Sequence, residues 1–464
     1  MNLFKRMVIL LGLVLTLSVP VPVWVLAQTI TDANDGTTLK QIIIFGRHSI
    51  RASTKSPFEL RKYSVDPYPG FEVRKGYLTP RGRQAEVLLG TYYRNYLLHE
   101  GLLTGNDRTD AACSYFRSNS IERSYVTAHA FRAGLIPHFE VGVHSFPLGE
   151  PIGQPDPVFD PILAKVAEVD PVRAATEAQA LFNSGAALAS AYSGEYSLIR
   201  SALFDYPLGT QPPPPKPTDK VDPTSKAITL TANTTTPLYT GGVIDMGGLS
   251  SVLAAADPFV MQYADGFPLD QVAWGRLTLD QLSQQTRIIS LQFNIEMLSP
   301  YLNKVQSSNA ASHVLRTMEQ AVISDYVPGS FGDARSRMVV VISSDAYVAG
   351  LAGLLQLHWQ LRGYQPDFCA PGGALVFELR QSKRTKEYLV RAFYTAQTFD
   401  QLRNLTPLTL AKPPATKQLL VPGGSKSATD LDVDFGVFQR LVRKAIDQKY
   451  VEDPSTEVPP GVWP

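Results

Sequence analysis

A histidine lies between two arginines directly after a short apolar run. Arg47, His48 and Arg51 follow residues 42–45, which read Ile-Ile-Ile-Phe. The rigid fork of arginine matches phosphate oxygens bidentately, and an imidazole nitrogen can act as a nucleophile. The pattern predicts a phosphate group held for attack by His48. The alternative is a surface ion-pair cluster at the end of a strand.

A second apolar run also ends in polar residues. Residues 338–342, Met-Val-Val-Val-Ile, precede Ser343, Ser344 and Asp345. A carboxyl group at such a place can donate and accept protons during catalysis. An aspartate at a strand end is also a common turn former or helix cap, so both roles for Asp345 stay open.

Both apolar runs have the character of buried strands. Consecutive isoleucines and valines are typical of strands covered on both faces, as in parallel sheets. In a doubly wound sheet, the chemistry takes place just past the carboxyl ends of the strands. We therefore predict an α/β fold that brings the ends of 42–47 and 338–343 side by side.

A helix is predicted to begin near residue 80. Thr79 is a suitable N-cap, and Pro80 suits the first helical position. Leu89, Tyr92 and Tyr96 then keep helical spacing.

Several segments, in order along nearly the whole chain, resemble motifs of the histidine acid phosphatases, a branch of the histidine phosphatase superfamily. Residues 47–53, RHSIRAS, are similar to the signature RHGxRxP, with Ser49 in place of the glycine and Ser53 in place of the proline. The later segments are most similar to bacterial periplasmic glucose-1-phosphatases and phytases. The segments that resemble family motifs are 76–82 (GYLTPRG), 113–118 (CSYFRS), 262–268 (QYADGFP), 271–275 (QVAWG) and 371–378 (PGGALVFE).

The resemblance implies both a fold and a reaction. The expected fold is an α/β, three-layer αβα core of the phosphoglycerate-mutase type with an inserted, mainly helical cap. His48 would become phosphorylated, and Arg47, Arg51 and Arg117 would bind the phosphate. Asp345 would protonate the leaving group and then accept a proton from water. No cofactor and no metal are expected.

One departure from the family concerns the second histidine, which binds phosphate. Ser344 stands at that position, and none of the seven histidines lies nearby in the sequence. Loss of one preorganised donor typically costs roughly 10²- to 10³-fold in turnover. The serine hydroxyl is shorter and uncharged, but it can still donate to a phosphate oxygen.

Two hypotheses about function follow from this departure. The first is a slow acid phosphomonoesterase that acts on sugar phosphates or related small phosphomonoesters. The second is an impaired relative that binds phosphorylated ligands. His48 and Asp345 favour the enzyme, because binding alone needs neither a nucleophile nor a proton donor. The cap segment around Asp160 has few cationic residues, which argues against a highly phosphorylated inositol substrate.

The first 27 residues have the layout of a secretory signal peptide. Lys5 and Arg6 precede a long apolar stretch that closes on a small residue, Ala27. We expect cleavage after Ala27 and a periplasmic or secreted protein, with a retained anchor as the alternative. Removing Lys5 and Arg6 leaves 41 basic against 42 acidic residues. This balance gives no support for nucleic-acid binding, and no later run is long enough to span a membrane.

The mature length is more than one ordinary core would hold, so we expect two parts. Residues 38–150 and 310–450 would form the α/β core, and 151–309 the helical cap. The proline run 211–217 predicts an exposed loop. The two cysteines, Cys113 and Cys369, would form one disulfide or stay free. The sequence leaves open whether the protein is a monomer or a homodimer.

Overall fold

The computed structural model describes residues 35–149, 153–210, 220–234 and 242–452. Within these ranges the central sheet has eight strands in the order β10-β8-β7-β1-β6-β2-β3, with β9 beside β8. The strands are β1 (Thr37–Arg47), β2 (Ser114–Ser118), β3 (Val143–His144), β6 (Met338–Ser343), β7 (Ala374–Ser382), β8 (Tyr388–Ala396), β9 (Ala415–Gln418) and β10 (Val433–Asp434).

The two predicted strands are neighbours in the centre of this sheet. β1 pairs with β6 in parallel, and Arg47 lies opposite Ser343. β2 pairs with the other side of β6, also in parallel. The carboxyl ends of β1 and β6 therefore meet at one edge, as predicted, and the carboxyl end of β2 lies beside them.

The sheet is mixed rather than wholly parallel. β1 is antiparallel to β7, and β7 is antiparallel to β8. β7 and β8 are joined by a short turn, and a connection of this length can only join antiparallel strands.

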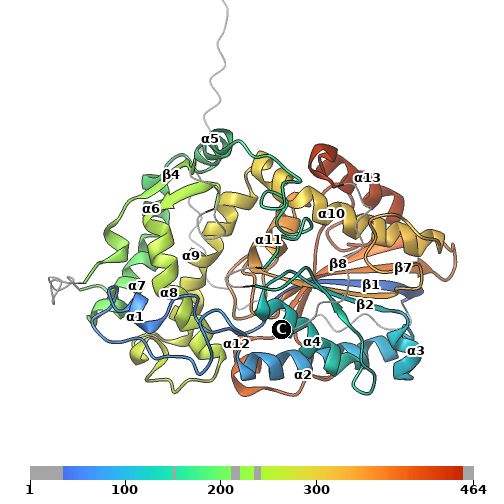
Figure 1. The fold of residues 1–464 in the computed structure, drawn as a ribbon, viewed down its shortest axis with the longest axis horizontal. Helices are drawn as coiled ribbons and strands as arrows, with labels where there is room; N and C mark the ends of the chain where they lie inside the picture. The colour runs from blue at the N-terminus through green and yellow to red at the C-terminus, as the bar shows by residue number, and fades with distance from the viewer. Residues whose placement is uncertain (1–34, 150–152, 211–219, 235–241, 453–464) are drawn as a thin grey trace, which may run out of the picture.

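Helices cover both faces of the sheet (Figure 1). Because side chains alternate along a strand, Ile42 and Ile44 pack with α2 (Pro80–His99) and α4 (Glu122–Leu135) on one face. Ile43 and Phe45 belong to the cluster on the other face. The further helices outside the cap insertion are α3 (Asp107–Ala111), α10 (Pro300–Ile323), α11 (Asp345–Leu354), α12 (Phe399–Asn404) and α13 (Phe435–Ala445), and the short α1 (Pro57–Leu60) lies beside the cap helices in Figure 1.

A mainly helical cap lies beside the sheet, at the left of Figure 1. It contains α5 (Pro171–Phe182), α6 (Gly185–Ala191), α7 (Ser193–Phe204), α8 (Gly248–Ala264), α9 (Leu279–Met297) and the small sheet of β4 (Ile228–Ala232) and β5 (Ile244–Gly247). The predicted three-layer core with an inserted helical cap is thus confirmed.

Several local predictions can be compared with the structure. The α2 helix begins at Pro80, and the Thr79 hydroxyl accepts a hydrogen bond from the Gly82 amide, as expected of an N-cap. Both cysteines are free. No helix in the described part of the chain is long and apolar enough to cross a membrane. The predicted signal peptide and proline run lie outside the described residues.

Candidate active site

His48 is the first residue after β1, and its backbone is fixed on both sides. Its amide donates to the Ser343 carbonyl at 2.8 Å, and its carbonyl accepts from the Gly372 amide at 3.1 Å. Its Nδ1 lies 2.9 Å from the Ser49 carbonyl oxygen. A carbonyl can only accept, so Nδ1 carries the hydrogen and Nε2 keeps its lone pair.

The surroundings of His48 keep its ring neutral. Burial lowers the pKa of His48 well below its usual value, and the positive charges of Arg123, Arg47 and Arg51 lower it further. The imidazole is only 2% exposed. A neutral ring in a cluster of guanidinium groups is the form that can attack an electrophile at mildly acidic pH.

Two arginines next to His48 are held by carboxylates. Arg47 Nη2 lies 3.0 Å from Asp345 Oδ2, and Arg47 Nη1 donates to the Cys369 carbonyl. Arg51 makes a bidentate pair with Asp257 of α8, at 2.9 and 3.1 Å. These pairs fix the direction of both guanidinium groups before any ligand binds.

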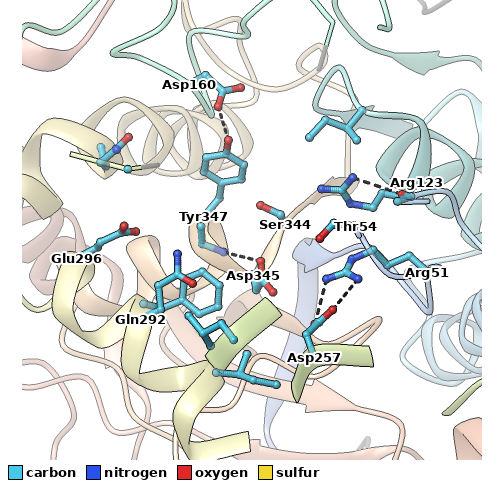
Figure 2. Close-up of a pocket in the computed structure, with 18 of the residues that line it drawn as sticks. Arg51, Thr54, Arg123, Asp160, Asp257, Gln292, Glu296, Ser344, Asp345 and Tyr347 are labelled. Atoms are coloured by element: carbon cyan, nitrogen blue, oxygen red, sulfur yellow. Dashed lines mark hydrogen bonds and ion pairs between the residues drawn. The ribbon is translucent and has the colours of Figure 1, made fainter. Parts of the chain in front are cut away.

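Ser344 and Asp345 lie where β6 gives way to α11. Ser344 is the N-cap residue, but its hydroxyl makes no capping hydrogen bond. Asp345 Oδ1 accepts from the Ala346 amide at 3.2 Å. Both side chains line the same cavity as Arg51 and Arg123 (Figure 2).

This cavity lies between the strand ends and the cap and holds about 780 Å³, a size suited to a small molecule. Its wall includes two exposed lysines, Lys55 and Lys75, beside Arg51 and Arg123. Among the described residues, no group of three or more histidines, cysteines and carboxylates could hold a metal ion.

Comparisons with known proteins agree with this geometry. No family model matches the chain. Phytase AppA of Escherichia coli strain K12 is 27% identical over 415 residues, which cover 88% of this chain and 92% of the phytase. Glucose-1-phosphatase of Providencia rettgeri is 26% identical over 433 residues, which cover 90% of this chain and 94% of the glucose-1-phosphatase. The Hafnia alvei phytase in complex with tartrate superposes with a TM-score of 0.78 at 26% identity, over 90% of this chain and 99% of that one.

Over most of its length the chain is similar in sequence and in fold to phosphatases of the histidine acid phosphatase type.

The third arginine that the sequence predicts to bind phosphate, Arg117, is paired with a carboxylate instead. Arg117 Nη2 lies 2.7 and 2.8 Å from the two carboxylate oxygens of Asp156. Its guanidinium group lies between the rings of Phe159 and Phe331, 5.9 and 5.8 Å from their centres. Arg117, like Arg47 and His48, is not among the residues that line the cavity.

Arg123, which the sequence analysis missed, takes the place expected of Arg117. It lies in the first turn of α4 and lines the cavity, and of the three arginines it lowers the pKa of His48 most. Figure 2 shows Arg123 and Arg51 on the same side of the cavity. A usable signal was present, because Arg123 lies in the first turn of the helix that follows β2, and helix N-termini after sheet strands commonly bind phosphate.

The cavity wall on the cap side carries carboxyl groups. The Tyr347 hydroxyl donates to Asp160, and burial raises the pKa of Asp160 to about 7. Burial and the negative charge of Asp345 also raise the pKa of Glu296 to about 7. Neither residue has a cationic partner in the part of the chain that the structure describes.

A further buried carboxyl lies behind the nucleophile. Glu86 of α2 is 1% exposed, and burial raises its pKa to about 8, against a smaller opposing effect of Ser49. A Cβ atom at Gly372 would lie 2.3 Å from Glu86 Oε1, so this oxygen packs tightly against the loop beside His48, while Ser49 Oγ lies at an ordinary contact distance of 3.6 Å.

Proposed function

We propose that the protein is an acid phosphomonoesterase that hydrolyses small phosphorylated substrates through a phosphohistidine intermediate. The observation that carries the proposal is the state of His48, a neutral imidazole with Nε2 free, surrounded by Arg47, Arg51 and Arg123. A phosphoryl group is the electrophile that such a cluster suits best, since arginine matches its oxygens in charge and shape.

The same residues divide the work of binding. Arg51 and Arg123, on the cavity wall, would neutralise the charge of the phosphoryl oxygens. Arg47, which is next to His48 in the chain, would also contact these oxygens and orient Asp345 through its ion pair. The Ser344 hydroxyl, which caps no backbone amide, would donate the hydrogen bond that a histidine supplies in the family. Binding through Arg117 stays a prediction that its pair with Asp156 disfavours.

Two in-line displacements complete the reaction. In the first, His48 Nε2 forms a bond to phosphorus, and the ester P–O bond breaks while Asp345 gives its proton to the departing oxygen. In the second, water attacks phosphorus, the P–N bond breaks, and Asp345 takes up the proton of the water. The arginines stabilise the charge on the transferring group in both steps. Because Asp345 must carry a proton when the alcohol departs, the reaction favours acidic pH.

A phosphate-binding role without turnover is the second candidate. The observation that favours it is the combination of Ser344 with arginines that are already paired to Asp345 and Asp257. Such a site lacks the hydrogen-bond donor that the second histidine supplies in the resembled family. Binding of phosphate would also weaken the Arg47–Asp345 and Arg51–Asp257 ion pairs.

The test is hydrolysis of p-nitrophenyl phosphate and glucose 1-phosphate by the chain without residues 1–27, at pH 5, beside His48→Ala. We expect turnover that the variant lacks. Turnover equal in both proteins would exclude the proposed enzyme, and phosphate binding without turnover would establish the second candidate.

We also propose that the protein is secreted or periplasmic. The support is the charged start, apolar stretch and small-residue end of residues 1–27. N-terminal sequencing of protein from the producing cell should begin at Gln28, and a sequence that begins at Met1 would exclude cleavage.

A further inference from the structure

One side of the cavity carries two arginines, one of which is paired with Asp257, and the other side carries two carboxyl groups without a cationic partner among the described residues. Figure 2 shows Arg51 and Arg123 on one side, Asp160 and Glu296 on the other, and Ser344 with Asp345 between them. All of these residues line the cavity. A phosphoryl group bound by the arginines would therefore direct its alcohol part toward the carboxyl groups.

Glu296 is available to a ligand. It lies near the end of α9, half-buried in the cavity wall, and makes no hydrogen bond or ion pair with any described residue. A Cβ atom at Gly242 would lie 2.7 Å from Glu296 Oε1, so the main chain packs closely against one side of this carboxyl. The charged group that acts on Glu296 is Asp345, which is also negative.

Asp160 adds a second carboxyl to this wall. Its side chain is 6% exposed, and Oδ1 accepts from the Tyr347 hydroxyl. Oδ2 is buried and has no hydrogen-bond partner among the described residues. The nearby charge of Asp156 is also negative, and its two oxygens are already bound to Arg117.

Carboxylates that are removed from water need a cation or a proton. The described part of the chain pairs neither Glu296 nor Asp160 with a lysine or an arginine, although Arg47, Arg51 and Arg117 each have a carboxylate partner. The missing positive charge can be supplied by the ligand.

We propose that this wall, which comprises Glu296, Asp160 and the amide of Gln292, selects phosphomonoesters whose alcohol part carries a protonated primary amine. An ammonium group has three donors and no acceptor, which suits a wall that offers carboxylate and amide oxygens. A substrate with several phosphates would instead place negative charge against the carboxyl groups. The proposal rests on the phosphatase function proposed above.

The pairing has a defined pH dependence. The pKa values of Asp160 and Glu296 are both raised to about 7. At pH 5 both carboxyl groups therefore carry a proton, which an ammonium group must displace, whereas at pH 7 a larger fraction is already ionised. Selectivity for the amine should therefore increase between pH 5 and pH 7.

Glucosamine 6-phosphate and glucose 6-phosphate form a matched pair, because they differ only in one amino group against one hydroxyl. We expect kcat/KM to favour the amine by about tenfold at pH 7, and by less at pH 5. Glu296→Gln and Asp160→Asn should reduce this ratio. Glu140→Gln, which removes an exposed carboxyl outside the cavity, should leave the ratio unchanged.

Dissociation constants of the two sugar phosphates for His48→Ala, measured by calorimetry, give the same ratio without turnover. They therefore test the amine site even where the proposed enzyme activity fails. A ratio near one at both pH values, or a ratio that survives in both carboxyl variants, would overturn the proposal.

Discussion

Substitution of Arg117 should reduce mainly the stability of the fold, whereas substitution of Arg123 should reduce mainly turnover. Arg117→Met should lower the free energy of unfolding, because the Arg117–Asp156 pair is buried, with side chains 6% and 0% exposed. Removing one partner of such a pair leaves a buried, unpaired carboxylate, which costs about 3–5 kcal/mol. Arg123→Met should lower turnover by roughly 10²- to 10³-fold, because one preorganised cation is lost from the site. It should lower the free energy of unfolding by about 1 kcal/mol or less.

Two assays on the same preparations separate these effects. Urea unfolding measures stability, and kcat/KM for p-nitrophenyl phosphate is measured at a temperature at which each variant stays folded. Arg335→Met serves as the control, because Arg335 is 73% exposed and pairs with an exposed aspartate. The reasoning is refuted if Arg117→Met retains stability but loses turnover, while Arg123→Met retains turnover.

Three further predictions concern single carboxyl and hydroxyl groups. Glu86 has a folded-state pKa of about 8 against an ordinary value of 4.5, so the folded protein holds this proton more tightly and loses stability as pH rises between these values. Glu86→Gln should flatten that loss in urea unfolding at pH 5 and pH 8; an unchanged slope would contradict the assignment. Ser344→His should raise turnover of p-nitrophenyl phosphate by up to roughly 10²-fold through the restored donor, and unchanged turnover would mean that Ser344 is not the limiting defect. Asp345→Asn should slow hydrolysis of sugar phosphates more than that of p-nitrophenyl phosphate, whose phenolate departs without a proton; equal slowing would count against proton donation.

The positions of His48 and Asp345 could be predicted because they depend on short-range patterns. Uninterrupted apolar residues identified β1 and β6 as buried strands, and parallel neighbours bring their ends together. The mixed sheet could not be predicted in the same way. Residues 41–47 of β1 are buried between a parallel and an antiparallel neighbour, and burial does not distinguish the two kinds of pairing.

The position of Arg117 away from the cavity wall has a physical cause. Successive side chains of a strand point to opposite faces, so an arginine inside β2 turns toward one face of the sheet, here toward Phe159 and Phe331. Arg123 lies past the strand end, at the start of α4, where side chains can reach the cavity. The sequence pattern could not decide which arginine lay past the end, because β2 has no long apolar run to mark it.

The carboxylate partners of the arginines could not be predicted from the sequence either. Asp257 meets Arg51 across 206 residues of sequence, and Asp156 reaches Arg117 from the start of the cap. Such contacts depend on how the cap packs on the core. The division into a core of 38–150 with 310–450 and a cap of 151–309 itself stays a prediction, as does the choice between monomer and homodimer.

Trapping the phosphoryl-enzyme tests the central claim most directly. The chain without residues 1–27 would be mixed with p-nitrophenyl phosphate, quenched in alkali to preserve phosphohistidine, digested and analysed by mass spectrometry. We expect a phosphoryl group on His48 and none in His48→Ala. Turnover that leaves His48 unmodified at every quench time, or a phosphoryl group on another residue, would contradict the mechanism.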